Sequence, residues 1–89
     1  MKKPRPNKQK EVTAQSFRRL ARKARSYRNL QRYSARQADR RLKAARRRLD
    51  RHALSDALVD RAAALGAAEA YDGFAAICDA EAHTLRGMR

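Results

Sequence analysis

The side chains best equipped for chemistry in this chain are its arginines and lysines, which gather between residues 17 and 51. That stretch carries fifteen Lys or Arg residues, two acids (Asp39 and Asp50), and neither Gly nor Pro. Such cations displace counterions from phosphates, and Arg can also make bidentate contacts to phosphate or guanine. These residue types therefore predict the binding of a polyanion, above all a nucleic acid.

The candidate binding residues are cations spread along this stretch, together with one tyrosine that could stack on a base. They are Arg18, Arg22, Arg25, Arg32, Tyr33, Arg36, Arg40, Arg41, Lys43, Arg46, Arg47 and Arg48. Their runs resemble, in composition, the arginine-rich helices that bind structured RNA. This resemblance slightly favours RNA over DNA as the expected ligand. A charge run is otherwise a solvated helix face, but the near absence of acids here disfavours that interpretation.

No constellation of residues predicts catalysis or a metal site, so we expect neither an enzyme nor a cofactor. His52 and His83 stand far apart, and the single cysteine excludes thiolate zinc sites of the CxxC kind. There is also no glycine-rich phosphate loop. Ser55 close to His52 lacks an oxyanion site and a third partner, and a role as a helix cap explains it better.

A long amphipathic helix, expected from about residue 13 to 51, positions the cations. At about 100° per residue, apolar side chains fall on one face and cations on the other. Thr13 or Ser16 could cap its start. The apolar stripe is interrupted between Tyr27 and Ala35, which predicts a bend there or a polar contact with a second chain. The stripe consists of Phe17, Leu20, Ala24, Tyr27, Ala35, Ala38, Leu42, Ala45 and Leu49.

Two shorter helices, at about 55–65 and 67–85, are expected to follow. Ser55 would cap the first, and Gly66 would separate them because their apolar faces point in nearly opposite directions. The first face comprises Leu54, Leu58, Ala62 and Leu65, and the second Ala67, Ala70, Phe74, Ile77, Cys78 and Leu85. The predicted fold is all-α: a single domain, residues 12–89, in which two Ala-rich helices fold back on the long basic helix as a small hairpin or bundle.

The net charge of +14 is distributed unevenly along the 89 residues. Residues 1–51 hold 20 basic and 3 acidic side chains, whereas residues 52–89 hold 3 and 6. Residues 1–11 form a basic tail with both prolines, which we expect to be flexible when free. Five aromatic residues and no Trp give little bulk for a core, so stability is expected to come partly from a partner or from self-association. The candidate protein-interface residues are Leu58, Leu65, Phe74 and Ile77.

The expected location is the cytoplasm, in association with the nucleoid or with ribonucleoprotein. A single cysteine cannot form an internal disulfide. The basic N-terminus has no apolar run after it, as a secretory signal would. The amphipathic face is mostly Ala, which is too weak for stable insertion into a membrane.

Two functional hypotheses follow. The first is a non-enzymatic nucleic-acid-binding protein. The alternative is a small inhibitor or accessory factor, encoded by a phage or plasmid. It would dock its basic helix on an acidic protein surface, or in a nucleic-acid channel of a polymerase, a ribosome or a CRISPR effector.

Overall fold

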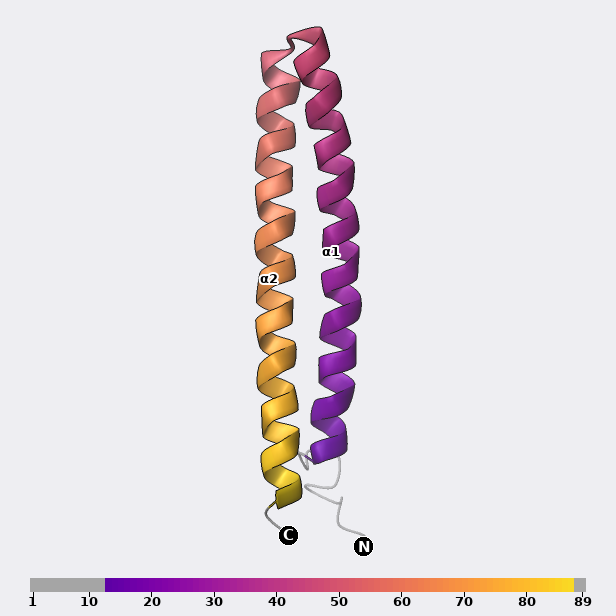
Figure 1. Ribbon diagram of the computed structural model, residues 1–89, viewed down its shortest axis with the longest axis vertical. Helices are drawn as coiled ribbons and strands as arrows, with labels where there is room; N and C mark the ends of the chain where they lie inside the picture. Colours follow the sequence, from indigo (N-terminus) through magenta and orange to yellow (C-terminus); the bar gives the residue numbers. More distant parts are fainter. Residues whose placement is uncertain (1–12, 88–89) are drawn as a thin grey trace, which may run out of the picture.

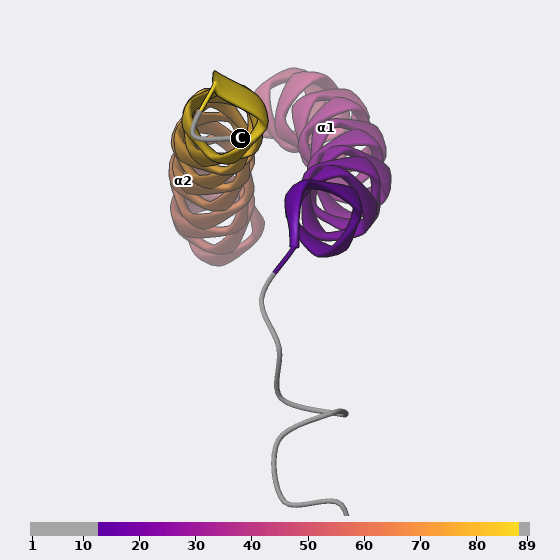
Figure 2. The same ribbon diagram turned by 90° about the horizontal axis from the view of Figure 1, so that it is seen from below.

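The computed structural model describes residues 13–87, which form two long helices, α1 (Ala14–Arg48) and α2 (Arg51–Gly87). The helices run antiparallel and lie side by side over their length (Figures 1 and 2). The predicted all-α class and the helical hairpin are thereby confirmed. The predicted tail, residues 1–11, lies outside the described residues. Within residues 13–87 neither helix has a stretch long and apolar enough to span a bilayer.

Local hydrogen bonds explain where each helix begins. Thr13 caps α1: its hydroxyl accepts from the Ser16 backbone N–H at 3.1 Å, and the Ser16 hydroxyl accepts from the Thr13 N–H at 3.4 Å. Leu49 reverses the chain in the left-handed region, at φ 54°. The Asp50 carboxylate then accepts from the Ala53 N–H at 3.1 Å. The prediction that Ser55 caps the second helix is therefore wrong, because Asp50 provides an acceptor one turn earlier.

The two helices meet along a seam of small side chains. In both helices the seam positions alternate in steps of three and four residues, the repeat of a coiled coil. Alanine side chains let the backbones approach closely. The buried seam residues of α1 are Ala21, Ala24, Ala35, Ala38, Leu42 and Ala45; those of α2 are Ala57, Ala64, Ala68, Ala75, Cys78 and Ala82.

The predicted break at Gly66 is wrong, because α2 continues through both Gly66 and Gly73 as one helix. A glycine within a helix costs about 1 kcal/mol relative to Ala, which a continuous buried seam on the opposite side can offset. The apolar faces assigned to two separate helices are also wrong. Of those ten residues only Cys78 is buried, whereas Leu58, Leu65, Phe74 and Ile77 are exposed.

The interruption of the apolar stripe between Tyr27 and Ala35 does not break the helix, since α1 runs as one helix from Ala14 to Arg48. Arg28 and Gln31 occupy the seam positions there and are half-buried. Arg28 makes a polar contact there with Asp72 of α2 in the same chain.

The hairpin has a thin core. Among the described residues the buried side chains are ten alanines, Leu42 and Cys78. Of the larger apolar residues expected in the stripe of the basic helix, only Leu42 is buried, and Phe17 packs half-buried against the seam. Leu20 and Tyr27 are about half-exposed, and Leu49 at the turn is 88% exposed. Most of the large apolar surface of this protein therefore faces outward.

Candidate nucleic-acid interface

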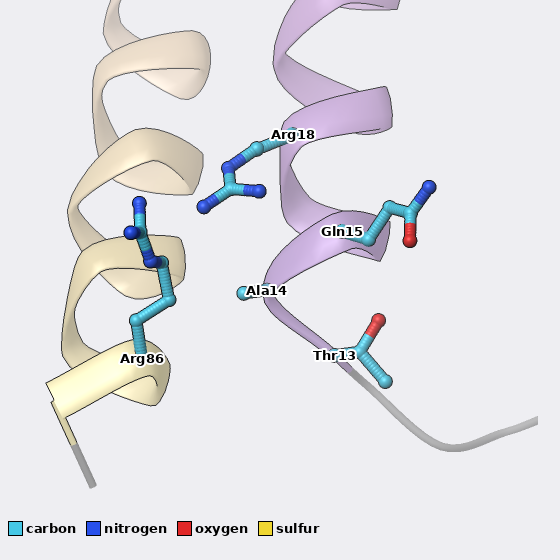
Figure 3. Close-up of a pocket in the computed structure, with 5 residues that line it drawn as sticks. All are labelled: Thr13, Ala14, Gln15, Arg18 and Arg86. Atoms are coloured by element: carbon cyan, nitrogen blue, oxygen red, sulfur yellow. The ribbon is translucent and has the colours of Figure 1, made fainter. Parts of the chain in front are cut away.

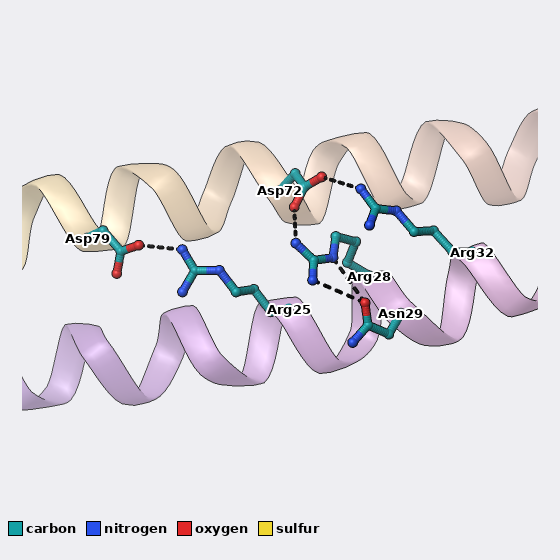
Figure 4. A network of polar contacts seen from close by, with 6 residues as sticks. All are labelled: Arg25, Arg28, Asn29, Arg32, Asp72 and Asp79. Carbon is teal, nitrogen blue, oxygen red and sulfur yellow. Dashed lines mark hydrogen bonds and ion pairs between the residues drawn. The ribbon is translucent and has the colours of Figure 1, made fainter.

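One group of α1 cations holds the hairpin together. Arg25 pairs with Asp79, and Figure 4 shows Arg28 and Arg32 reaching the two oxygens of Asp72 from the opposite helix. Arg28 Nη1 donates to Asp72 Oδ1 at 2.7 Å, and Arg32 Nη2 donates to Oδ2 at 3.0 Å. These arginines therefore bind their own chain.

Nearer the turn, two further contacts join the helices. Arg41 Nη1 donates to Asp60 Oδ2 at 3.0 Å. Asp39, the one acid of α1, lies 3.6 Å from Arg61 Nε and 3.4 Å from Lys43 Nζ. Of the eight acids within residues 13–87, the four that form ion pairs (Asp39, Asp60, Asp72 and Asp79) thus all contact the opposite helix.

Asp72 is the centre of the polar contacts in the middle of the hairpin. The hydrogen bond from Arg28 lowers the pKa of the Asp72 carboxyl, although partial desolvation opposes this effect. The charges of Arg28, Arg32 and Arg25 lower the pKa further. Arg28 is itself oriented by Asn29, whose Oδ1 accepts from Nε at 3.2 Å and from Nη2 at 3.1 Å.

A second group of cations points away from α2. We call the outward line of α1 the arginine ridge, comprising Arg19, Arg22, Arg36, Arg40, Lys43 and Arg47. All six are exposed. Apart from the pair between Lys43 and Asp39, none of them forms an ion pair with an acid in the part of the chain that the structure describes. The ridge is therefore a surface of uncompensated positive charge.

The ridge has a polar middle. Ser26, Asn29 and Tyr33 continue the same line of α1 between Arg22 and Arg36. Tyr33 is 55% exposed, so its ring is accessible to a ligand lying along the ridge. At 1.5 Å per residue, the ridge from residue 19 to residue 47 is about 42 Å long.

Two further arginines meet at the open end of the hairpin. Figure 3 shows the Arg18 side chain extending from α1 toward α2, while the Arg86 side chain runs along its own helix, α2. They line a hollow of about 780 Å³ together with Thr13, Ala14 and Gln15, none of which is acidic. Two guanidinium groups that line one hollow repel each other, and an anion placed between them would remove that repulsion.

The residues that the sequence singled out for binding thus separate into distinct sets. Arg25, Arg32 and Arg41 are engaged with α2, and Arg18 lies at the open end. Arg46 and Arg48 are exposed beside the turn. The remaining members lie on the ridge: Arg22, Tyr33, Arg36, Arg40, Lys43 and Arg47.

Sequence reasoning missed the roles of Arg28 and Arg86. A signal was available for the pairing between the helices. Arg25 and Arg32 are seven residues apart, as are Asp72 and Asp79, which is the spacing that aligns two edges of an antiparallel coiled coil.

The four candidate interface residues divide between the two edges of the hairpin. Leu65 lines a hollow with Arg32, Ala35 and Asp39, whereas Phe74 lines a groove with Leu20 and Tyr27. Leu58 lies seven residues before Leu65 and therefore on the same edge, whereas Ile77 lies three residues after Phe74, on the next turn of the same side of α2.

Within residues 13–87 no group of three His, Cys, Asp or Glu residues is arranged to hold a metal ion. Cys78 is a free thiol buried in the seam. The chain matches no protein-family model, and it is significantly similar to no curated protein and to no solved structure.

Proposed function

We propose that this is a non-enzymatic nucleic-acid-binding protein whose arginine ridge contacts phosphates, with structured RNA slightly ahead of DNA. One observation carries the proposal. The five ridge arginines have no acidic partner within the described residues, although other arginines of the same helix find acids on α2.

This separation matters because, among the acids that form ion pairs within the described residues, only Asp39 reaches a ridge cation. Asp60, Asp72 and Asp79 point to the junction between the helices, and Asp39 meets Lys43 and Arg61. Repulsion between neighbouring ridge cations remains in the free protein. A polyanion would relieve that repulsion and release its own counterions, which are the two sources of affinity expected for a phosphate-binding helix.

The dimensions of the ridge fit an extended ligand better than a small anion. Duplex DNA carries about one negative charge per 1.7 Å of its axis, so a ridge of about 42 Å faces many phosphates at once. The exposed Tyr33 ring interrupts the cations at the middle of this line. An unpaired base stacked on Tyr33, between two runs of phosphate contacts, is the arrangement that favours RNA with loops or bulges.

The test is a titration of labelled hairpin RNA and of the matching hairpin DNA at a series of salt concentrations, read by fluorescence anisotropy. The double substitution Arg36→Gln, Arg40→Gln removes two ridge cations. It should reduce the slope of log K against log salt by about 1.4 to 1.8, since each phosphate contact contributes about 0.7 to 0.9.

The matched control is Arg48→Gln, Arg51→Gln. It removes the same charge from two exposed arginines off the ridge, on either side of the turn. The slope of log K against log salt should change by much less in this control than in the ridge variant. Equal slopes for the two variants would mean that net charge alone drives binding and that the ridge is not the interface. Retention of a discrete protein partner after nuclease treatment of a pull-down, with no binding to either hairpin, would favour the accessory-factor hypothesis instead.

A further inference from the structure

One edge of the hairpin carries an apolar surface that the two helices leave uncovered. Leu20 and Tyr27 of α1 and Tyr71 and Phe74 of α2 line a groove of about 290 Å³, with Lys23 also on its wall. Tyr27 and Tyr71 lie against each other, with ring centroids 5.4 Å apart.

Two more side chains extend this surface. Leu30 and Ile77 lie one helical turn beyond Tyr27 and Phe74, and they are 61% and 62% exposed. We call these five residues the apolar patch: Leu20, Tyr27, Leu30, Phe74 and Ile77.

The apolar patch is large for a protein of this size. Large apolar side chains present on the order of 200 Å² each when free, so five residues about half-exposed offer roughly 500 Å². This extent is typical of the largest apolar patch on a monomeric protein, and such patches are often functional. The patch also holds bulkier side chains than the seam, where the described residues bury only alanines, Leu42 and Cys78.

We propose that the apolar patch is the interface of a homodimer, in which a second copy covers it to form a four-helix bundle. Two patches together would bury about 1,000 Å², which reaches the lower limit for a specific interface. Neighbouring exposed side chains, such as Ala70, would add to this area. A bundle of four helices would give the large apolar side chains the interior that two helices cannot provide.

Charge determines how the two copies are oriented. Residues 14–48 hold fourteen basic and one acidic side chain, whereas residues 51–87 hold three basic and six acidic. If the hairpins stack with their turns at the same end, each α1 faces the α2 of the other copy. If the turns lie at opposite ends, α1 faces α1, and two strongly basic helices repel each other. The first arrangement is therefore the one proposed.

A specific pair of charges borders the apolar patch in this arrangement. Lys23 lies beside the groove on α1, and Glu81 is exposed on α2. Both lie close to the level of the contact between Arg25 and Asp79. Lys23 of one copy would then face Glu81 of the other, on each side of the dimer axis. The arginine ridge stays uncovered, so the dimer would present two ridges.

The first experiment measures the mass of the full chain by sedimentation equilibrium, from low micromolar to several hundred micromolar protein. The expected mass approaches twice the 10.2 kDa of the chain as concentration rises. Ile77→Asp places a charge in the apolar patch at a position that is exposed in the single hairpin, and it should weaken dimerisation at least tenfold. Val59→Asp is the matched control, because Val59 lies on the same helix away from the patch and is 64% exposed.

A charge exchange tests the orientation separately. Lys23→Glu and Glu81→Lys should each weaken the dimer, and the two together should restore it. A chain that stays monomeric throughout, or an equal loss in Ile77→Asp and Val59→Asp, would overturn the interface. Loss in Ile77→Asp without rescue by the charge exchange would overturn the orientation. Circular dichroism of each variant establishes that the helices are intact, so that loss of the dimer is not mistaken for unfolding.

Discussion

At the scale of single residues, Asp72 shows how this chain divides its arginines between structure and binding. Its carboxylate accepts from Arg28 and Arg32 at once, and these bonds use two of the cations that a sequence count would assign to a ligand. Arg36, four residues further along the same helix, has no such partner among the described residues. The difference between a structural and a binding arginine is therefore set by the residue that faces it on α2.

This role makes the stability of the hairpin sensitive to acid. Because the folded-state pKa of Asp72 is lower than its unfolded value, the stabilisation is fully present above the unfolded pKa, about 3.8. It is lost as the pH falls through the folded pKa. Asp72→Asn should lower the melting temperature at pH 7, and the difference from the parent protein should close in strong acid. Thermal melts across the acid range check this.

Glu69→Gln serves as the control, because Glu69 is exposed and forms no ion pair within the described part of the chain. It should leave the melting temperature nearly unchanged at every pH. A difference for Asp72→Asn that stays constant from neutral to acid pH would show that the negative charge is not what Asp72 contributes.

At the scale of the helices, the seam reverses the usual relation between the size of an apolar side chain and its burial. Close approach of two helices requires small side chains, so alanines are buried while Leu58, Leu65 and Phe74 lie outside. α2 accommodates Gly66 for a related reason. Gly66 faces away from the seam, and a methyl group added there would meet no atom within 4 Å.

Gly66→Ala should therefore stabilise the protein by about 0.5 to 1 kcal/mol, since Ala loses less backbone entropy than Gly in a helix. Chemical denaturation followed by circular dichroism measures the change. Gly73→Ala, equally open around the added methyl group, should give a similar gain. Destabilisation by Gly66→Ala would indicate that the helix is interrupted at Gly66 in solution, as the sequence alone had suggested.

The sequence predicted the helical class and the basic helix, because the period of 3.6 residues is strong wherever cations and apolar residues alternate. Its candidate binding residues include five of the six ridge cations, all but Arg19. It did not predict the continuity of α2. There the larger side chains change face near Gly66, whereas the seam is carried by alanines such as Ala64 and Ala68 that do not stand out in an Ala-rich segment. The division of arginines into paired and free could not be read from α1 alone, because it depends on the register against α2.

At the scale of the whole molecule, the hairpin is polarised across its width. The basic helix and the acidic helix attract each other along their junction, while the arginine ridge repels itself along the outer face. Arg36 and Arg40 are four residues apart, as are Lys43 and Arg47, so each pair is destabilising in the free protein. Within the described residues only Asp39 offsets this repulsion, through its pair with Lys43.

The balance between these two effects can be measured through ionic strength. Screening weakens both the attraction and the repulsion, but the net charge of +14 means that repulsion is the larger of the two. The melting temperature of the free protein should therefore rise by several degrees as sodium chloride is increased. Arg36→Gln, Arg40→Gln should raise the melting temperature at low salt and flatten its dependence on salt. These are the two substitutions expected to weaken binding, so the same arginines would stabilise the complex and destabilise the free chain. A melting temperature that falls with salt would instead mean that the ion pairs between α1 and α2 outweigh the repulsion along the ridge.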